Sequence, residues 1–535
     1  MSFDKTRTRE LLIIVIFCVF FFFYALNAIG LVGADEPRYA QVAREMLTSG
    51  DWVTPTLYGN AWLEKPVLYY WGSMVSYWLL GVRDWAARVP CAAWAALMAL
   101  VIYFCMRRFR RSAELGSALM TCSTVAIFGF ARGASTDMPL AAAFTIAMLA
   151  WFSWYATAQK RWLALFYFFI GFGALAKGPV APGLAALLII PFALVKREPR
   201  VIARTLWLPG IAAFLAVTLP WYVMVQLRNP QFFAEFILRQ NFTRFSSNLY
   251  RHHYPWWYYA PVLLLGLFPW TIFSIRGLIY SIRVAGGREQ EPDPREGELK
   301  ALHLFLILWA LIPVLFFSIS QSKLPGYILP AIPAWILLAA LYLVRAAELS
   351  KPIPTWISIL QSLWLATIGA GVMLGPRLMV HPHEAIPANV LRTTAFVFVG
   401  VLLFAFAFMR VGGWEMLRFA TLLPTILALG FVLKIAAPVI DGAQSARPVA
   451  EQLATINRSN LPVAVNHVHR TVEYGLGFYR NQKTFNYEQD EMPQGRHILV
   501  APLENPGTPP AGAWKRVWVG EFGPQRLGYW WMVPQ

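Results

Sequence analysis

The chain has 535 residues, of which 58% are hydrophobic and only 14% are charged, and its mean hydropathy is +0.49. A soluble domain usually carries about 25% charged residues, so this composition excludes an ordinary water-soluble protein. The formal net charge of +18 is compatible with nucleic-acid binding. However, Lys and Arg stand in short clusters between apolar blocks, where they set membrane topology and face anionic lipid, so we expect no nucleic-acid partner.

Apolar blocks near 20 residues long recur along the chain, and each is long enough to cross about 30 Å of hydrocarbon as a helix. The first, Leu11–Val32, follows a basic segment at residues 5–9 and lacks a small-residue cleavage site. It therefore predicts a retained span with a cytoplasmic amino end. Twelve more blocks bring the prediction to thirteen spans: 89–106, 114–131, 138–157, 162–176, 179–195, 205–226, 256–275, 301–319, 325–344, 355–375, 391–409 and 414–436.

The charges of the connecting loops test this topology independently. An odd number of spans puts the carboxyl end outside, which predicts a transmembrane domain over 1–440 and an external domain over 441–535. The external loops are then the remaining ones, above all 33–85 and 227–255. Alternate loops carry the clusters of Lys and Arg that mark the cytoplasmic side: 107–111, 160–161, 196–204 and 276–300.

The external tail has the pattern of a small folded domain. Short apolar runs, separated by Gly, Pro and Asn, occur at Leu461–Val465, His497–Pro502 and Trp514–Val519. Runs of this length, bounded by turn residues, are typical of strands. We therefore expect a small α/β domain of about 95 residues.

The first external loop opens with two acids and a basic residue around a proline. Asp35 or Glu36 stands near an N-cap, Pro37 stands near the first helical position, and apolar residues follow at helical spacing. This predicts an amphipathic helix in the outer interface, with Tyr39 on its apolar face. Its positive end, with Arg38 one turn inside, can hold a phosphate. The alternative is that the two acids only cap a surface helix.

The same loop repeats this pattern before the second span. Glu64, Lys65 and Pro66 precede an aromatic helical segment that begins at Val67. Loop 33–85 therefore contains two predicted helices, each beginning at charged residues. This indicates a folded platform rather than a linker, with its ionisable groups on the outer face.

Three further ionisable residues stand at the outer ends of spans. Asp137 brings another acid to the outer face, or is a plain N-cap. Lys177 and Lys323 are lone cations at tight external turns, and a lone lysine at a span end commonly extends to lipid headgroups. Ionisable groups placed here are costly unless they are used, so all three are candidates for the active face.

The second long external loop ends in an aromatic run, Tyr254–Tyr259, which is typical of the membrane interface. Arg251, His252 and His253 precede it. The two histidines and the distant Glu64 could ligate a metal, although adjacent residues rarely bind one ion together and a complete ligand set is not visible.

Six motifs in order resemble the bacterial aminoarabinose lipid A transferases, which belong to the GT-C class of membrane glycosyltransferases together with the protein O-mannosyltransferases. The resemblance spans the first external loop to the tenth span. It implies an α-helical polytopic membrane protein of GT-C fold, with about thirteen transmembrane helices, external juxtamembrane helices and a small C-terminal α/β domain. The motifs are Asp35–Tyr39, Arg44–Leu47 with Gly50–Trp52, Glu64–Pro66, Thr136–Pro139, Lys177–Pro179 and Lys323–Pro330.

The resemblance also implies roles for individual residues. Asp35 corresponds to the key catalytic carboxylate, Glu36 belongs to the same motif, and Asp137 is the second loop acid. Some members hold zinc between a glutamate and a histidine, which would be Glu64 with His252 or His253. The positions matching those that bind the phosphate of a polyprenyl-phosphate sugar are Arg38, Lys65 and Tyr327, and further candidates for the active face are Tyr39, Lys177, Arg251 and Lys323.

The expected activity is inverting transfer of a sugar, aminoarabinose or a related one, from a polyprenyl phosphate. The acceptor would be lipid A or another envelope glycan, lipid or protein, on the periplasmic face of the bacterial inner membrane. Pro37, Val67 and Gly326 differ from the residues frequent in the family, which leaves the acceptor open. The rivals are a polyprenyl-glycan polymerase or ligase, and a flippase for lipid-linked sugars, which would be expected to have polar, broken helices at mid-membrane.

Overall fold

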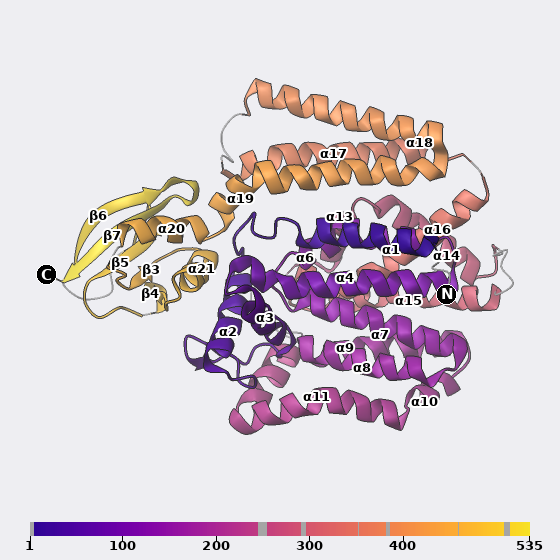
Figure 1. The fold of residues 1–535 in the computed structure, drawn as a ribbon, viewed down its shortest axis with the longest axis horizontal. Helices are drawn as coiled ribbons and strands as arrows, with labels where there is room; N and C mark the ends of the chain where they lie inside the picture. Colours follow the sequence, from indigo (N-terminus) through magenta and orange to yellow (C-terminus); the bar gives the residue numbers. More distant parts are fainter. Residues whose placement is uncertain are drawn as a thin grey trace.

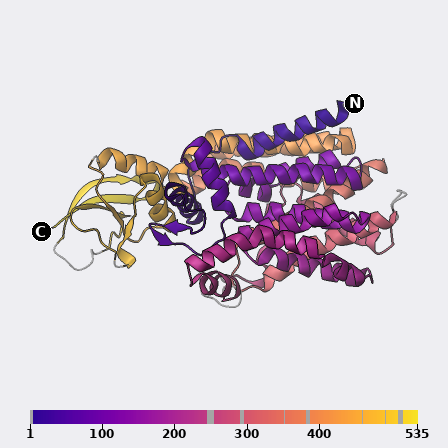
Figure 2. The same ribbon diagram turned by 60° about the horizontal axis from the view of Figure 1, so that its bottom comes forward.

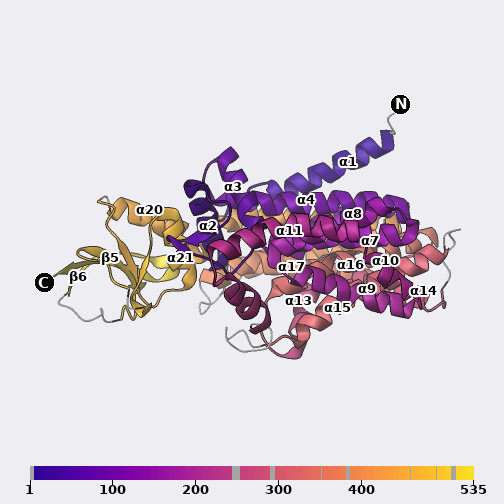
Figure 3. The same cartoon turned by 90° about the horizontal axis from the view of Figure 1, so that it is seen from below.

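The computed structural model describes residues 5–243, 254–289, 296–350, 352–380, 386–457, 459–489, 491–507 and 514–534. A bundle of long helices carries a small α/β domain at one end, and the amino terminus lies at the opposite end (Figure 1). Turned views show the domain projecting beyond the bundle (Figures 2 and 3). The predicted fold class, with external helices and a small C-terminal domain, is confirmed.

The helices follow the apolar blocks of the sequence closely. In the first half they are α1 (Lys5–Cys18), continued by a π-helical turn (Val19–Phe23), α2 (Asp35–Ser49), α3 (Leu68–Leu80), α4 (Asp84–Phe109), α5 (Glu114–Ser123), α6 (Val125–Ala131), α7 (Asp137–Thr157), α8 (Lys160–Lys177), α9 (Val180–Val195), α10 (Arg200–Thr205) and α11 (Leu208–Arg228). In the second half they are a π-helix (Phe233–Thr243), α13 (Tyr259–Gly266), α14 (Thr271–Ala285), α15 (Glu296–Ile319), a 3-10 segment (Pro325–Ala331), α16 (Ile332–Glu348), α17 (Thr355–Val380), α18 (Ala388–Phe431), a π-helical turn (Val432–Ala436) and α19 (Ala437–Gln444).

Seven helices among the described residues are long and apolar enough to cross a membrane, and nine if each of two bent pairs is one span. The bent pairs are α5 with α6, at 61°, and Trp256–Gly266 with α14, at 112°. One reason why fewer than thirteen spans are counted is that α18 is counted as one helix. Gly413, with φ 57° and ψ −146°, interrupts α18, and the chain doubles back there (Figure 1). The count of thirteen stays a prediction.

The centre of the bundle is formed by α7 and α16, each with 83% of its apolar window buried. Large aromatic side chains fill the space between them and their neighbours. Trp151 of α7 stacks on Phe305 of α15, with ring centroids 5.6 Å apart, and meets Phe192 of α9 edge-on at 5.5 Å. Such rings bury much apolar surface and hold the spans in fixed relative positions.

The external segment after α1 forms the predicted platform. Helix α2 begins at Asp35 and ends at Gly50, which has φ 70° and closes the helix in a left-handed conformation. A short antiparallel hairpin of β1 (Thr56–Leu57) and β2 (Asn60–Ala61) follows. Glu45 of α2 accepts hydrogen bonds from the hairpin, including the backbone N–H of Tyr58 at 2.8 Å.

The C-terminal domain has a five-stranded sheet in the order β4-β3-β5-β7-β6. Strand β3 pairs in parallel with β4 and β5, whereas β7 is antiparallel to β5 and β6. Helices α20 and α21 pack on one face through Val449, Leu453 and Leu476. The elements are α20 (Arg447–Ile456), β3 (Val463–Val465), α21 (Arg470–Arg480), β4 (Phe485–Asn486), β5 (His497–Pro502), β6 (Trp514–Phe522) and β7 (Leu527–Pro534).

This domain is fixed to the bundle by a buried polar network. Arg447 donates to Asp441 at 2.7 Å and to Asp84, the first residue of α4, at 3.1 Å. The backbone N–H of Gly30 donates to Asp441 at 2.7 Å, and that of Leu31 donates to the Tyr479 hydroxyl at 2.8 Å. The domain therefore sits directly on the start of the first external segment.

Candidate active site

Asp35 lies at the exposed start of α2. The N-cap position is Ala34, whose side chain cannot cap the helix. The Asp35 carboxylate forms an ion pair with Arg38, one turn later, and 54% of the Asp35 side chain is exposed. Its carboxylate is therefore accessible to a bound substrate.

The guanidinium of Arg38 packs against two aromatic rings. Its central carbon lies 5.3 Å from the centroid of Trp62 and 5.0 Å from that of Tyr474 in α21. Only 12% of the side chain is exposed. Burial by itself lowers the pKa of Arg38, but the charges of Asp35 and Glu64 raise it, and the net shift is upward. Arg38 is thus a fixed cation.

Glu36 points the other way, into the protein. Its carboxylate accepts hydrogen bonds from Arg88 of α4 at 2.6 Å and from the backbone N–H groups of Val32 at 2.8 Å and Ala134 at 2.6 Å. Arg88 also donates to the backbone carbonyl of Gly30 at 2.7 Å. These contacts join the start of α2 to α4 and to the loop before α7, so the geometry favours a positioning role for Glu36.

A group of buried tyrosines lies behind Arg38. The ring centroids of Tyr39 and Tyr70 are 6.1 Å apart, and both side chains are buried. Burial, together with the nearby acids Asp35 and Glu64, raises the pKa of both phenols well above its ordinary value, so both are neutral. Lys65 is half-buried beside Glu64, in the segment that leads into α3.

A second group of predicted residues surrounds the start of α7. Asp137, the first residue of α7, forms an ion pair with Lys177 at the end of α8. The Lys177 ammonium lies 4.7 Å from the ring centroid of Tyr327. A Cβ on Gly326 would stand only 2.9 Å from the carboxylate carbon of Asp137, so the glycine allows this close approach. The structure therefore brings Asp137, Lys177 and Tyr327 together.

The two groups share one end of the bundle. Glu36, next to Asp35, binds the backbone of Ala134, and Ala134 is three residues from Asp137. Lys323 is oriented differently: it is buried, and its ammonium donates to the carbonyl of Ser320 in its own turn at 2.5 Å. Burial lowers the pKa of Lys323.

The remaining predicted residues are Arg251, a candidate for the active face, and the proposed metal ligands. Arg251, His252 and His253 lie outside the described residues. Within the described ranges, no three His, Cys, Asp or Glu side chains are grouped so that they could hold a metal ion. Of the predicted ligand set, the structure thus places Glu64 alone, near Arg38.

Reasoning from the sequence missed three residues of this region: Arg88, Trp62 and Tyr474. Arg88 stands one residue before the predicted span 89–106, so the sequence assigns it to the external loop, and only the start of α4 at Asp84 places it inside the helix. Trp62 stands two positions before Glu64, and the sequence does not distinguish it from the many other aromatic residues typical of a membrane interface. Tyr474 gives no local signal, since it reaches Arg38 only through the folding of the C-terminal domain.

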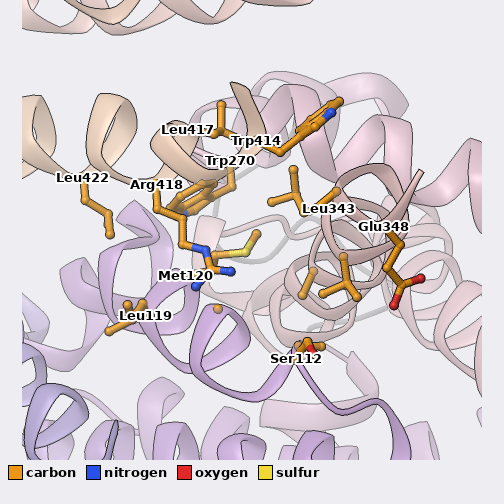
Figure 4. Close-up of a pocket in the computed structure, with 15 residues that line it drawn as sticks. Ser112, Leu119, Met120, Trp270, Leu343, Glu348, Trp414, Leu417, Arg418 and Leu422 are labelled. Atoms are coloured by element: carbon orange, nitrogen blue, oxygen red, sulfur yellow. The ribbon is translucent and has the colours of Figure 1, made fainter. Parts of the chain in front are cut away.

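A cavity of about 260 Å³ lies at the opposite end of the bundle, between α5, α14, α16 and α18 (Figure 4). Met120, Trp270, Leu343, Trp414 and Arg418 are among its lining residues. It contains none of the predicted residues. Helix α4, about 39 Å long at 1.5 Å per residue, separates the loop before α5 from the platform.

Comparison with known proteins places this arrangement in a family. Residues 64–224 match the family described as dolichyl-phosphate-mannose-protein mannosyltransferase. The undecaprenyl phosphate-alpha-4-amino-4-deoxy-L-arabinose arabinosyl transferase 1 of Sodalis glossinidius is 30% identical over 514 residues, which cover 91% of this chain and 88% of the relative. The chain belongs to this arabinosyl transferase family. It is accordingly a membrane glycosyltransferase.

Other members of the family and a solved structure agree. The arabinosyl transferase of Aeromonas hydrophila is 29% identical over 465 residues, covering 84% of this chain and 81% of the relative. The crystal structure of ArnT from Cupriavidus metallidurans bound to undecaprenyl phosphate has a TM-score of 0.74 with 24% identity, and it covers 98% of both chains. This structural likeness shows the GT-C fold.

Proposed function

We propose that the protein transfers 4-amino-4-deoxy-L-arabinose, or a closely related sugar, from undecaprenyl phosphate to lipid A. The reaction would take place on the periplasmic face of the bacterial inner membrane. The observation that carries the proposal is the pair formed by an exposed carboxylate, Asp35, and a fixed guanidinium, Arg38, at the start of α2. The names of the relatives support the donor and the sugar.

Asp35 suits the acceptor side of the reaction. The acceptor oxygen attacks the anomeric carbon, the bond from that carbon to the phosphate oxygen breaks, and its electrons remain on the phosphate. Direct displacement inverts the anomeric centre. If the acceptor is a hydroxyl, Asp35 accepts its proton; if it is a phosphate, which is already ionised, Asp35 orients the reacting groups.

The cations suit the leaving phosphate, whose charge grows in the transition state. Arg38 offers several N–H donors in a fixed plane and Lys65 offers a point charge. Tyr327, whose ring packs against the Lys177 ammonium, supplies a neutral hydroxyl donor. Removing one fixed donor from such a site typically costs about 3 kcal/mol of transition-state stabilisation.

Asp137 and Lys177 support a second part of the site. Their ion pair neutralises both groups and places Lys177 against Tyr327. We propose that the pair orients Tyr327 and the turn at Gly326, and that Asp137 contacts the sugar or the acceptor. Tyr39 completes the wall behind Arg38.

A metal is a further possibility that the family resemblance raises. Glu64 would be one ligand, and a bound zinc ion would supply positive charge beside the phosphate. Since the described residues provide one carboxylate of the predicted set, the steps above involve protein groups alone.

A direct test is transfer by the purified protein in detergent or lipid nanodiscs. Undecaprenyl phosphate-aminoarabinose and lipid A would be incubated with the wild-type protein and with Asp35→Asn, and lipid A would be analysed by mass spectrometry. We expect one added sugar mass with the wild type alone. Equal product from Asp35→Asn would overturn the catalytic role of Asp35.

The rivals require a second measurement. Scrambling of the lipid-linked sugar would be measured in proteoliposomes without acceptor. Rapid scrambling without product when lipid A is present would establish a flippase instead. Mass spectrometry of total lipids from cells with and without the protein would reveal another acceptor, because the donor would accumulate while lipid A stayed unchanged.

A further inference from the structure

The C-terminal domain contributes a side chain next to the candidate phosphate site. The central carbon of the Arg38 guanidinium lies 5.0 Å from the ring centroid of Tyr474, on α21, and 5.3 Å from that of Trp62 in the platform. Arg38 and Tyr474 are far apart in the chain and meet because α21 packs along α2 (Figure 3). The cation is therefore enclosed by two separate parts of the protein.

Two contacts fix the position of Tyr474. One turn after it, Gly477 lies so close to the Tyr58 hydroxyl that a Cβ there would stand 1.9 Å from the oxygen. At the end of α21, Arg44 of α2 donates to the carbonyl of Phe478 at 2.8 Å and to the side-chain oxygen of Asn481 at 3.0 Å. Helix α21 therefore has one register against α2.

The same hairpin fixes the other ring. Tyr58 stands in the turn between β1 and β2, and Trp62 directly follows β2. The backbone N–H of Trp62 donates to the carbonyl of Pro55 at 2.8 Å. The two rings that enclose Arg38 are thus held at a set separation by one short hairpin.

A guanidinium packed against two rings and bonded at two of its nitrogens is restricted in rotation. The Arg38 Nε donates to the carbonyl of Ala34 at 3.0 Å, and another nitrogen pairs with Asp35. A free arginine side chain has large rotamer entropy, so fixing it in advance strengthens its binding to an anion. The aromatic faces also stabilise the cation directly.

We infer that Tyr474 is a positioning residue of the active site, through which the C-terminal domain orients Arg38 toward the phosphate of the lipid carrier. The inference rests on the proposed function, since it assigns Tyr474 a role in the binding of that phosphate. It gives the domain a part in the reaction beyond covering the bundle.

The test uses the full-length protein and measures both the binding of undecaprenyl phosphate and the kinetics of sugar transfer. Tyr474→Phe keeps the ring and removes only the hydroxyl, which also interacts with Arg38, so it should weaken binding less than loss of the whole ring does. Tyr474→Leu removes the ring and should weaken binding about 3- to 30-fold, the range expected for loss of a cation–π contact. Tyr474→Gln serves as a second variant if Tyr474→Leu does not fold, because Tyr474 is half-buried and tolerates a polar group.

A double-mutant comparison separates positioning from a general loss of structure. In an Arg38→Gln background, Tyr474→Leu should change binding by less than about twofold, since the cation that it orients is gone. Effects that simply add would overturn the inference. The matched control is Lys483→Ala, which breaks an exposed ion pair with Glu491 inside the same domain and removes none of the contacts that position Tyr474. This control should leave binding unchanged.

The outcomes distinguish this inference from the proposed function. If Arg38→Gln alone leaves carrier binding and transfer unchanged, Arg38 is not part of the phosphate site and the inference about Tyr474 fails, while the transferase function stands. Absence of transfer by the wild type would overturn the proposed function itself. If Arg38→Gln impairs both while Tyr474→Leu behaves as the wild type, only the role of Tyr474 is overturned.

Discussion

Asp35 and Glu36 are consecutive residues with opposite surroundings. Asp35 is about half exposed beside Arg38, whereas Glu36 is buried against Arg88 and two backbone N–H groups. The first turn of α2 thus presents one carboxylate to the site and uses the next to join α2 to α4. Substitutions at these neighbours should separate catalysis from stability.

Asp35→Asn should reduce transfer at least about 100-fold, the usual contribution of a general base, without loss of stability. The side chain is exposed enough for the amide to be accommodated. Transfer rate and thermal unfolding of the purified variant would be measured together. Turnover near the wild-type rate would show that Asp35 has no chemical role.

Glu36→Gln should unfold the platform instead, because it leaves the Arg88 charge buried without its partner at a cost of about 3–5 kcal/mol. We expect lower expression and a lower unfolding temperature. Glu45→Gln on the same helix is a useful comparison, since its partners are chiefly the hydroxyl and N–H groups of the hairpin. A stable Glu36→Gln variant would contradict this assignment.

Gly326→Ala should lower kcat/KM about 10- to 100-fold, the effect expected when a reactive group moves by a fraction of an ångström to one ångström. The new methyl group would stand 2.9 Å from the carboxylate carbon of Asp137 and 3.0 Å from both of its oxygens. Gly183→Ala in α9 is the control, because a Cβ there meets nothing within 4 Å. Unchanged kinetics of Gly326→Ala would show that the position of Asp137 does not matter.

Arg447→Ala should loosen the C-terminal domain. It removes the cation between Asp84 and Asp441, whose side chains are each only 10% exposed, at a cost of about 3 kcal/mol. The expected result is faster proteolysis between the bundle and the domain. Lys483→Ala breaks a more exposed ion pair with Glu491 and should have almost no effect. Equal cleavage rates for both variants would count against the network.

The C-terminal domain should lose stability in mild acid through His497. Burial lowers the pKa of His497 below 6.5, although its bond to the Gly495 carbonyl opposes the shift. Below about pH 6.5 the unfolded chain then binds more protons than the folded one, so stability falls as the pH falls. Above that pH the contribution is complete.

Hydrogen exchange of the β5 amides between pH 7.5 and 5.5, corrected for intrinsic rates, would measure this effect. His497 bonds to the Tyr487 hydroxyl and packs on Trp514, so protonation disturbs a closed site. His497→Gln should flatten the pH dependence. A slope that persists in His497→Gln would assign it to another group.

Hydrophobicity and local helix signals account for what the sequence predicted well. The start of α2 at Asp35 and the aromatic helix after Pro66 follow from turn and capping patterns, and both are present. The three apolar runs of the tail became β3, β5 and β6. These features depend on residues close together in the chain.

What the sequence did not reveal depends on distant partners. Glu36 meets Arg88, 52 residues later, and no local pattern distinguishes its buried carboxylate from that of Asp35. Lys177 read equally well as a lipid-facing lysine, and its ion pair with Asp137 exists only in the packed bundle. The bend between α13 and α14 also involves a distant segment, because the carbonyl of Phe268 in the bend accepts a hydrogen bond from the N–H of Val125 at the start of α6.

The hydrogen bonds between the first external segment and the C-terminal domain have a consequence for biogenesis. Gly30 and Asp441 are 411 positions apart, and Leu31 and Tyr479 are 448 apart. At typical synthesis rates of about 5–20 residues per second, the early segment waits roughly 20–90 s for these partners. During that interval its polar groups lack their final hydrogen bonds. Completion of the site is therefore coupled to synthesis of the last part of the chain, and a prematurely terminated product would expose an unfinished platform to proteolysis.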